Sequence, residues 1–244
     1  MSDSLNFRKI FAPTGELRAV INLGNAILAK ASTIPKADPT GVSVDLAKKF
    51  ALQLDVPLKL IAVKKALDAV NFVASGRADI GFFAVDPSRA ELITFTQPYV
   101  VIQGAYMVPA NSPIKDNNEV DSANNHIVVG QGSAYDLHLS RHIKHAEIIR
   151  APSSQEVVDH FLKHNFEVAA GVRRQLEIDA ERVGDSVRIL PGHFMEIQQA
   201  MGVSRERGDL AGEYLNQFVR LIKESGEVQQ ILDDNKVTGA VVAQ

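Results

Sequence analysis

Short apolar runs alternate with amphipathic segments along the N-terminal part of the chain. The runs typical of strands cover residues 17–22, 58–63 and 78–84, and apolar residues at helical spacing cover 42–54 and 67–75. Strands separated by helices in this way are typical of βαβ units around a mostly parallel sheet. The pattern therefore predicts an α/β fold.

A second series of strands and helices follows an extended run at residues 104–109. Within it, Ser153-Ser-Gln-Glu156 has the spacing of a capping box, in which the two outer side chains bond to backbone N–H groups at a helix start. We therefore predict a helix from Ser153. The complete series has strands at 126–130, 147–150 and 167–170 and helices from Ser133 and Ser153.

The C-terminal part begins with another extended run, residues 197–203, and continues with two amphipathic helices at 209–223 and 226–234. The chain has no internal repeat, low-complexity run or Pro/Gly/Ser linker. Any domain boundary must therefore be a hinge within folded structure.

Composition excludes several classes of function. A chain of 244 residues forms one large domain or two small ones, and its net charge of -3 gives no excess of base for nucleic acid. The absence of Cys removes disulfides, thiol catalysis and thiolate metal sites. No segment approaches the roughly 20 apolar residues of a membrane span, so no direct membrane insertion is expected.

Asp86-Pro87-Ser88-Arg89 follows the third predicted strand and has the features of a helix start. Asp is a favoured N-cap, and Pro is preset for the first helical position. Arg89 would then lie in the first helical turn, where backbone N–H groups and the helix dipole favour an anion. An arginine there can bind a carboxylate with two parallel hydrogen bonds. A solvated arginine on a capped helix would give the same pattern.

Gly130-Gln-Gly-Ser-Ala134 opens the first helix of the second series. Gly132 allows close approach to the backbone, Ser133 is a good N-cap, and Asp136 stands three residues later, as in a capping box. The segment is typical either of a well-capped helix or of an anion-binding helix start.

Together with Phe95-Thr-Gln-Pro-Tyr99, these motifs resemble the signature of the type II periplasmic solute-binding proteins of polar amino-acid ABC transporters, the bacterial extracellular solute-binding proteins of family 3. The resemblance implies a two-lobed α/β fold with mixed, mostly parallel sheets and a two-strand hinge. Lobe 1 would comprise residues 1–106 and 201–244, and lobe 2 residues 107–200. The ligand would lie between the lobes, which close around it.

The resemblance also implies a set of ligand-binding residues. Arg89 of lobe 1 and the turn Gly132-Ser133-Ala134 of lobe 2 would bind the same ligand carboxylate. The full implied set is Arg89, Ala84, Phe83, Asn22, Asn25, Gly132, Ser133, Ala134, Gly171 and Gln199.

Some of these positions depart from the family pattern. Asn22 and Asn25 replace an Asp and an aromatic residue, and Phe83 and Ala84 replace Ser/Thr donors, in a turn about two residues shorter than usual. Gly171 stands where amino-acid binders carry the Asp that pairs with the ligand's ammonium. A buried ammonium without a carboxylate partner is unfavourable. Either the ligand lacks an α-amino group, or another carboxylate such as that of Glu196 replaces the missing one.

We therefore expect a solute-binding protein that closes on a small carboxylate ligand, an amino acid or a related organic acid, for ABC-type uptake. It would be a monomer, would perform no catalysis, and would need no cofactor. His138, His142 and His145 share a predicted helix face, but no carboxylate or Cys completes a metal site.

Two alternatives use the same scaffold. One is an enzyme similar to the cyclohexadienyl dehydratases, which needs a carboxylic acid in the cleft to protonate a leaving group. The other is a cytoplasmic ligand sensor. The first ten residues lack the apolar core of a secretory signal. We therefore expect one of two locations: either Met1 replaces the leader of a periplasmic protein, or the protein is cytoplasmic. A periplasmic protein would have an ABC permease as its partner.

Overall fold

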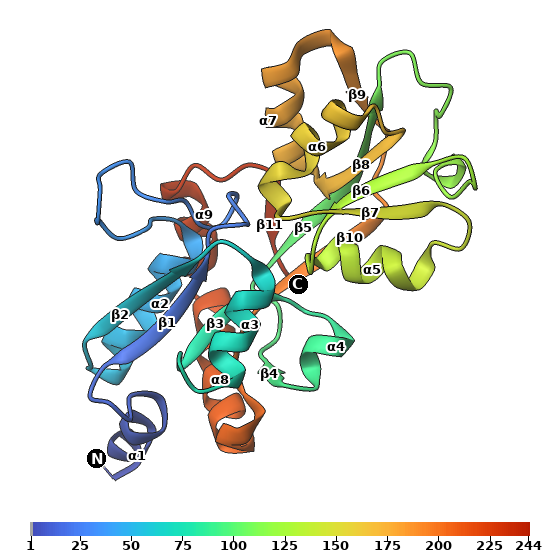
Figure 1. The fold of residues 1–244 in the computed structure, drawn as a ribbon. Helices are drawn as coiled ribbons and strands as arrows, with labels where there is room; N and C mark the ends of the chain where they lie inside the picture. Colours follow the sequence, from blue (N-terminus) through green and yellow to red (C-terminus); the bar gives the residue numbers. More distant parts are fainter. Residues whose placement is uncertain (1) are drawn as a thin grey trace. The chain divides into compact units, whose positions relative to one another are not determined.

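The computed structural model describes residues 2–244 and divides into two compact units (Figure 1). Unit 1 consists of the residues up to Val101 together with Gln198–Gln244, and unit 2 consists of Ile102–Ile197. The alternation of strands and helices predicted from the sequence is present in both units, and the fold is α/β.

The chain crosses between the units within two strands, β5 (Val100–Pro109) and β10 (Met195–Ser204). These strands coincide with the two extended runs at which the crossings are expected from the sequence. The expected lobe boundaries, after residues 106 and 200, lie a few residues later than the unit boundaries, which follow Val101 and Ile197.

The sheet of unit 1 has the strand order β2-β1-β3-β10. Strand β1 runs parallel to both β2 and β3, whereas β10 is antiparallel to β3 and to the short strand β4. The strands of this unit, besides the part of β10 from Gln198 onward, are β1 (Leu17–Asn22), β2 (Leu58–Val63), β3 (Ile80–Ala84), β4 (Ile93–Phe95) and β11 (Ala240–Val242).

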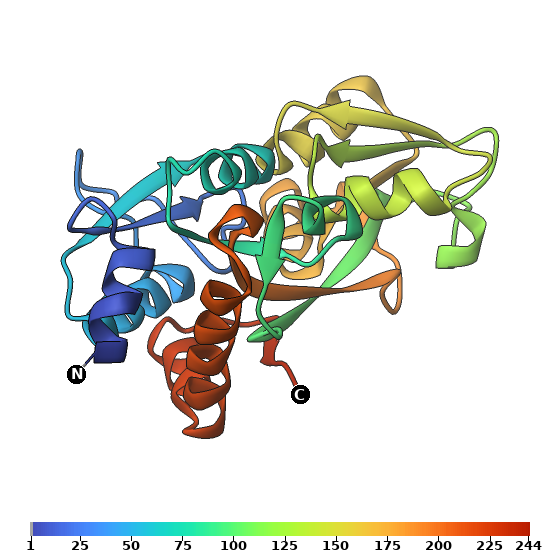
Figure 2. The ribbon, with the colours of Figure 1, turned by 90° about the horizontal axis from the view of Figure 1, so that it is seen from below.

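Helices cover both faces of this sheet. Helix α3 packs on β1 and β3, and α2 packs on β1 and β2. Helices α1, α2, α8 and α9 also pack against one another (Figure 2). Because β3 is buried along its whole length, it has a continuous apolar run rather than an alternating one. The helices are α1 (Ser2–Phe11), α2 (Val42–Leu54), α3 (Ala66–Ala74), α4 (Pro87–Ala90), α8 (Asp209–Glu224) and α9 (Glu227–Asp234), with a 3-10 turn at Arg205–Arg207.

A fully buried carboxylate connects distant segments of unit 1. Asp79 precedes β3 and is 0% exposed. Its Oδ2 accepts hydrogen bonds from the backbone N–H and the Nε of Arg18, at 2.8 and 2.9 Å, and its Oδ1 accepts from Nη2 of Arg18 at 2.8 Å. Arg207 donates to the same Oδ1 and to the carbonyl oxygen of Ile10 at the end of α1. Two arginines, Arg18 on β1 and Arg207 after β10, thus compensate the buried charge.

Unit 2 has the strand order β5-β8-β6-β7. Strand β6 is parallel to β7 and β8, and β5 is antiparallel to β8 and β9. Its elements are β6 (His126–Gly130), α5 (Ala134–His142), β7 (Glu147–Ala151), α6 (Val157–His164), β8 (Val168–Val172), α7 (Arg173–Val183) and β9 (Val187–Ile189), with 3-10 turns at Asn117–Glu119, Ser154–Glu156 and Gly184–Ser186.

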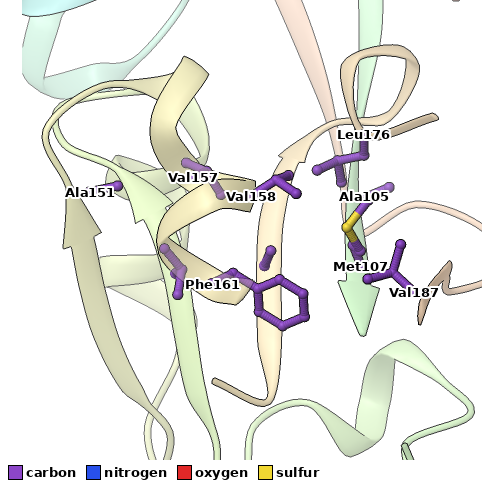
Figure 3. Packing of buried hydrophobic residues seen from close by; sticks show 10 residues of the cluster. Ala105, Met107, Ala151, Val157, Val158, Phe161, Leu176 and Val187 are labelled. Atoms are coloured by element: carbon purple, nitrogen blue, oxygen red, sulfur yellow. The ribbon is translucent and has the colours of Figure 1, made fainter. Parts of the chain in front are cut away.

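The core of unit 2 lies between its sheet and the helices α6 and α7. Figure 3 shows Val157, Val158 and Phe161 of α6 directed toward side chains of the sheet. Leu176 is the buried residue of α7 in this cluster. The other members are Ala105, Met107, Val128, Ala151, Ala169 and Val187.

One local prediction for unit 2 needs correction, and one helix of unit 2 was not predicted. The helix predicted from Ser153 begins as a 3-10 turn, and α6 starts only at Val157. Ser153 does not cap it through the backbone; its hydroxyl donates to Oε2 of Glu156 at 2.7 Å, so the two side chains satisfy each other. Helix α7 lacks a strong apolar pattern, since Leu176 is its buried residue, and the sequence did not predict it.

Candidate ligand-binding site

The helix start predicted around Arg89 is present. Helix α4 begins at Pro87, and Asp86 is its N-cap, with Oδ1 accepting hydrogen bonds from the backbone N–H of Ser88 at 2.9 Å and from its hydroxyl at 2.6 Å. The helix ends within four residues, and the backbone N–H of Arg89 bonds to the carbonyl of Asp86 at 3.1 Å. The short helix therefore fixes the position of Arg89 next to the end of β3.

Arg89 is buried, with only 6% of its surface exposed, so the alternative of a solvated arginine is wrong. Its Nη1 donates to the carbonyl oxygen of Ala84 at 3.0 Å. Burial lowers the pKa of Arg89 to about 10, because the cation has lost hydration, and the nearby charge of Asp86 opposes this shift only in part. A desolvated guanidinium of this kind is stabilised by an anion.

Two further predicted residues lie beside Arg89. Ala84, whose carbonyl accepts from Arg89, is the register partner of Gln199 on β10. The carbonyl of Gln199 accepts from the backbone N–H of Tyr99 at 2.8 Å, and Gln199 is buried. The structure thus brings Arg89, Ala84 and Gln199 together at the carboxyl end of β3.

The side chain of Phe83 does not belong to this group. It packs in the unit 1 core with residues of β1 and α3, including Val20 and Val70, and it contacts the ring of Phe95. Successive side chains of a strand point to opposite faces. The ring of Phe83 therefore belongs to the unit 1 core, and ligand binding at Phe83 stays a prediction for its backbone N–H group.

Asn22 and Asn25 follow β1. Because β1 and β3 are parallel neighbours, the end of β1 lies at the same sheet edge as Ala84. Oδ1 of Asn22 accepts from the backbone N–H of Gly24 at 2.9 Å, which is the role of an ordinary turn residue. Oδ1 of Asn25 differs: it is buried, and no residue that the structure describes donates a hydrogen bond to it.

In unit 2, the predicted start of α5 is confirmed. Ser133 is the N-cap, and its Oγ accepts from the backbone N–H of Asp136 at 3.1 Å. Gly132 has φ +70°, a left-handed conformation that favours glycine. Among the described residues, no acceptor is bonded to the backbone N–H groups of Ala134 and Tyr135. The helix start therefore presents these two amides together with the Ser133 side chain.

Gly171 needs a reinterpretation. A Cβ built at this position would lie 3.1 Å from Cδ2 of Leu176, a residue of the unit 2 core. An Asp at position 171 would therefore point toward the core rather than outward. The next residue, Val172, is half-buried and precedes α7, so the end of β8 has no carboxylate on either face.

Neither a metal-ligand group nor a membrane-spanning helix is found in the described part of the chain. No group of three His, Cys, Asp or Glu residues among residues 2–244 has the geometry of a metal site. No helix among these residues has both the length and the apolar character needed to cross a membrane.

Two α/β units connected through two strands define the class of two-lobed solute-binding proteins. The sequence profile of the bacterial extracellular solute-binding proteins, family 3, matches residues 29–235, and the chain belongs to this family.

Individual relatives support the fold. The L-cysteine solute receptor of Neisseria gonorrhoeae superposes with a TM-score of 0.79 at 20% identity, covering 93% of both chains. The ancestral amino-acid-binding protein AncCDT-1, described as a precursor of cyclohexadienyl dehydratase, superposes with a TM-score of 0.76 at 16% identity, covering 94% of this chain and 99% of the other.

A relative by sequence is the amino-acid-binding protein AabA of Dichelobacter nodosus. It is 29% identical over 103 residues, which span 41% of this chain and 40% of AabA. The similarity thus covers about two fifths of the length of AabA. The predicted type II two-lobed fold is confirmed by the family and by the solved structures.

Proposed function

We propose that this protein is the substrate-binding component of an amino-acid-type ABC transporter and that Arg89 binds a carboxylate of its ligand. The observation that carries the proposal is the burial of the Arg89 guanidinium, which lowers its pKa to about 10. A carboxylate would compensate the desolvated charge with two charge-assisted hydrogen bonds. The bond to the Ala84 carbonyl orients the guanidinium for this contact.

The start of α5 supplies the second set of donors in this proposal. The backbone N–H groups of Ala134 and Tyr135, at the positive end of a nine-residue helix, are suited to an anion. Binding by one group from each unit would make closure of the two lobes depend on the ligand.

The ligand is proposed to be an amino acid or a related organic acid. Asn22, Asn25 and Gln199 would add neutral polar contacts, and the buried Oδ1 of Asn25 suits a ligand hydrogen-bond donor. Because neither Gly171 nor Val172 provides a carboxylate, we expect weak discrimination for an α-ammonium group.

Uptake requires a permease and an ATPase as partners, and the proposed location is the periplasm, with a single chain acting as the binding unit. The family's extracellular members support export. The dehydratase-like alternative has less support. The candidate residues form two half-sites, one around Arg89 in unit 1 and one at the start of α5 in unit 2, and none of these candidates is a carboxylic acid able to act as general acid.

A thermal-shift panel tests the proposal. The twenty L-amino acids and their deaminated analogues are added separately to the purified protein. Binding to the native state alone must raise the melting temperature, and we expect this from one or more members of the panel, with the rise lost in Arg89→Ala. If no carboxylate compound stabilises the protein, the proposal is wrong.

A further inference from the structure

The start of α5 depends on a buried carboxylate that itself has no place in the proposed set of ligand contacts. Asp136 is 4% exposed. Its Oδ2 accepts a hydrogen bond from the backbone N–H of Gly132 at 2.8 Å. The turn before the helix is therefore closed by Asp136 in addition to the cap that Ser133 provides.

Arg150 of β7 holds Asp136 in this position. Its Nε lies 3.1 Å from Oδ1 and 3.3 Å from Oδ2 of Asp136. Its Nη2 donates to Oγ of Ser140 at 2.8 Å, and the Ser140 hydroxyl in turn donates to Oδ1 of Asp136 at 3.2 Å. The three side chains form a closed network behind the ligand-facing turn.

The sheet register explains why Arg150 reaches this position. In the parallel pair β6 and β7, Val129 is opposite Arg150 and Gly130 is opposite Ala151. The backbone N–H of Gln131 continues the pairing by donating to the carbonyl of Ala151 at 3.0 Å. The turn after β6 therefore begins beside Arg150.

Asp136 presents an electrostatic problem that Arg150 solves. A carboxylate in the first turn of a helix interacts favourably with the helix dipole, but it repels an anionic ligand at the same helix end. Arg150 cancels this charge at hydrogen-bond distance. The Arg150 side chain is 45% exposed, but Asp136 is buried, so replacing Arg150 leaves a buried carboxylate without its cation and should lower the stability of unit 2.

We propose that Arg150 is a positioning residue for ligand binding: it keeps Asp136 bonded to the Gly132 amide and neutralises the Asp136 charge next to the anion-binding turn. This inference rests on the proposed function, since it assigns Arg150 a role at the same site. Arg150 itself does not contact the ligand.

Three variants test this role, Arg150→Gln, the double variant Asp136→Asn/Arg150→Gln, and the control Arg182→Gln. Arg182 is a comparably exposed arginine of unit 2 that pairs with Asp159 and Asp179. One measurement is calorimetry with the L-amino acid of the thermal-shift panel that stabilises the wild type most, at low and high salt. The other is hydrogen exchange of the Gly132 amide without any added compound.

We expect Arg150→Gln to weaken binding about tenfold at low salt and less at high salt. The double variant should regain most of the affinity, because the Asn oxygen still accepts from Gly132 but carries no charge. The Gly132 amide should exchange faster in Arg150→Gln than in the wild type, and Arg182→Gln should change neither measurement. Because Asp136→Asn also relieves the uncompensated buried charge, the salt dependence separates the roles: a purely structural role would lower the melting temperature in step with affinity, and the loss of affinity would not depend on salt.

The two proposals fail in different ways. If no panel compound binds the wild type, the proposed function is wrong, and the Gly132 exchange rate alone decides the positioning role. Wild-type exchange and affinity in Arg150→Gln would overturn the role of Arg150 while leaving the proposed function intact. Equal effects of Arg150→Gln and Arg182→Gln, or a double variant no better than the single one, would also overturn it.

Discussion

The two candidate half-sites use different physical means to attract an anion. Unit 1 offers a full positive charge, Arg89, which is buried at the end of β3 and oriented by a carbonyl oxygen. Unit 2 offers backbone amides at a capped helix start, where the carboxylate of Asp136 is neutralised by Arg150. A single substitution can therefore remove the contribution of unit 1, whereas the contribution of unit 2 is spread over several groups.

The largest expected effect comes from removing the charge of unit 1. Arg89→Ala should abolish binding of the carboxylate, at a loss of about 2–5 kcal/mol, because a desolvated charge partner disappears. Arg89→Lys should restore only part of it, since lysine has no planar fork. Calorimetry measures the affinity, and circular dichroism checks that the variants fold. Wild-type affinity in folded Arg89→Ala would contradict the assignment.

A smaller effect is expected in unit 2. Ser133→Ala removes the cap of α5 and should cost about 1 kcal/mol of stability, together with a moderate loss of affinity. Ser153→Ala is the matched control, because Ser153 precedes a helix without capping its backbone. Thermal unfolding of both variants provides the comparison, and an equal loss in the two would show that the cap at Ser133 is unimportant.

The next prediction concerns the class of ligand that the two half-sites accept. If both units bind the anion as proposed, and with no carboxylate at the end of β8, an amino acid and its deaminated acid should differ in affinity by less than about a hundredfold. Calorimetry on such a matched pair decides the matter. A hundredfold preference for the amino acid would mean that a carboxylate elsewhere, for example that of Glu196, pairs with the ammonium.

The smallest expected effect is that of pH on stability and affinity, because Arg89 stays charged near neutral pH. The pKa of Arg89 is lowered to about 10 in the folded protein, below that of an arginine in the unfolded chain, so the folded state binds fewer protons above about pH 10. The lowered pKa of Arg89 therefore makes the folded protein more stable as pH rises above about 10. The affinity for a carboxylate should change in the opposite direction, because the uncharged Arg89 side chain no longer attracts an anion. We expect the affinity to be constant below about pH 9 and to fall above about pH 10. The Arg89→Lys variant provides the reference titration.

Sequence patterns predicted those parts of the molecule in which local chemistry decides the structure. The caps at Asp86 and Ser133 and the βαβ order follow from side chains that act within a few residues. The direction of a side chain at a strand end depends instead on which helix covers each face. For this reason the sequence did not show that the Phe83 ring packs in the unit 1 core, nor the constraint that Leu176 imposes at Gly171.

The network behind α5 was also beyond the reach of the sequence. Asp136 was recognised as part of a capping pattern, but Arg150 lies on another strand, and its contact with Asp136 follows from the register of β6 and β7. A signal was present in the combination of a charged residue on β7 and an acid in the first turn of the preceding helix. Spacing along the chain alone does not show that the two meet.

The buried Asp79 has a consequence for the order in which the chain folds during synthesis. Its second arginine partner, Arg207, emerges from the ribosome long after Arg18, with the whole of unit 2 between them. Unit 2 is continuous in sequence and can complete its core as soon as it is made, whereas unit 1 must wait for the last segment before Asp79 is fully compensated. A nascent chain that ends before Arg207 should therefore contain a protease-resistant C-terminal portion and a protease-sensitive N-terminal one. The N-terminal segment of unit 1 would thus stay incompletely folded until translation is nearly finished.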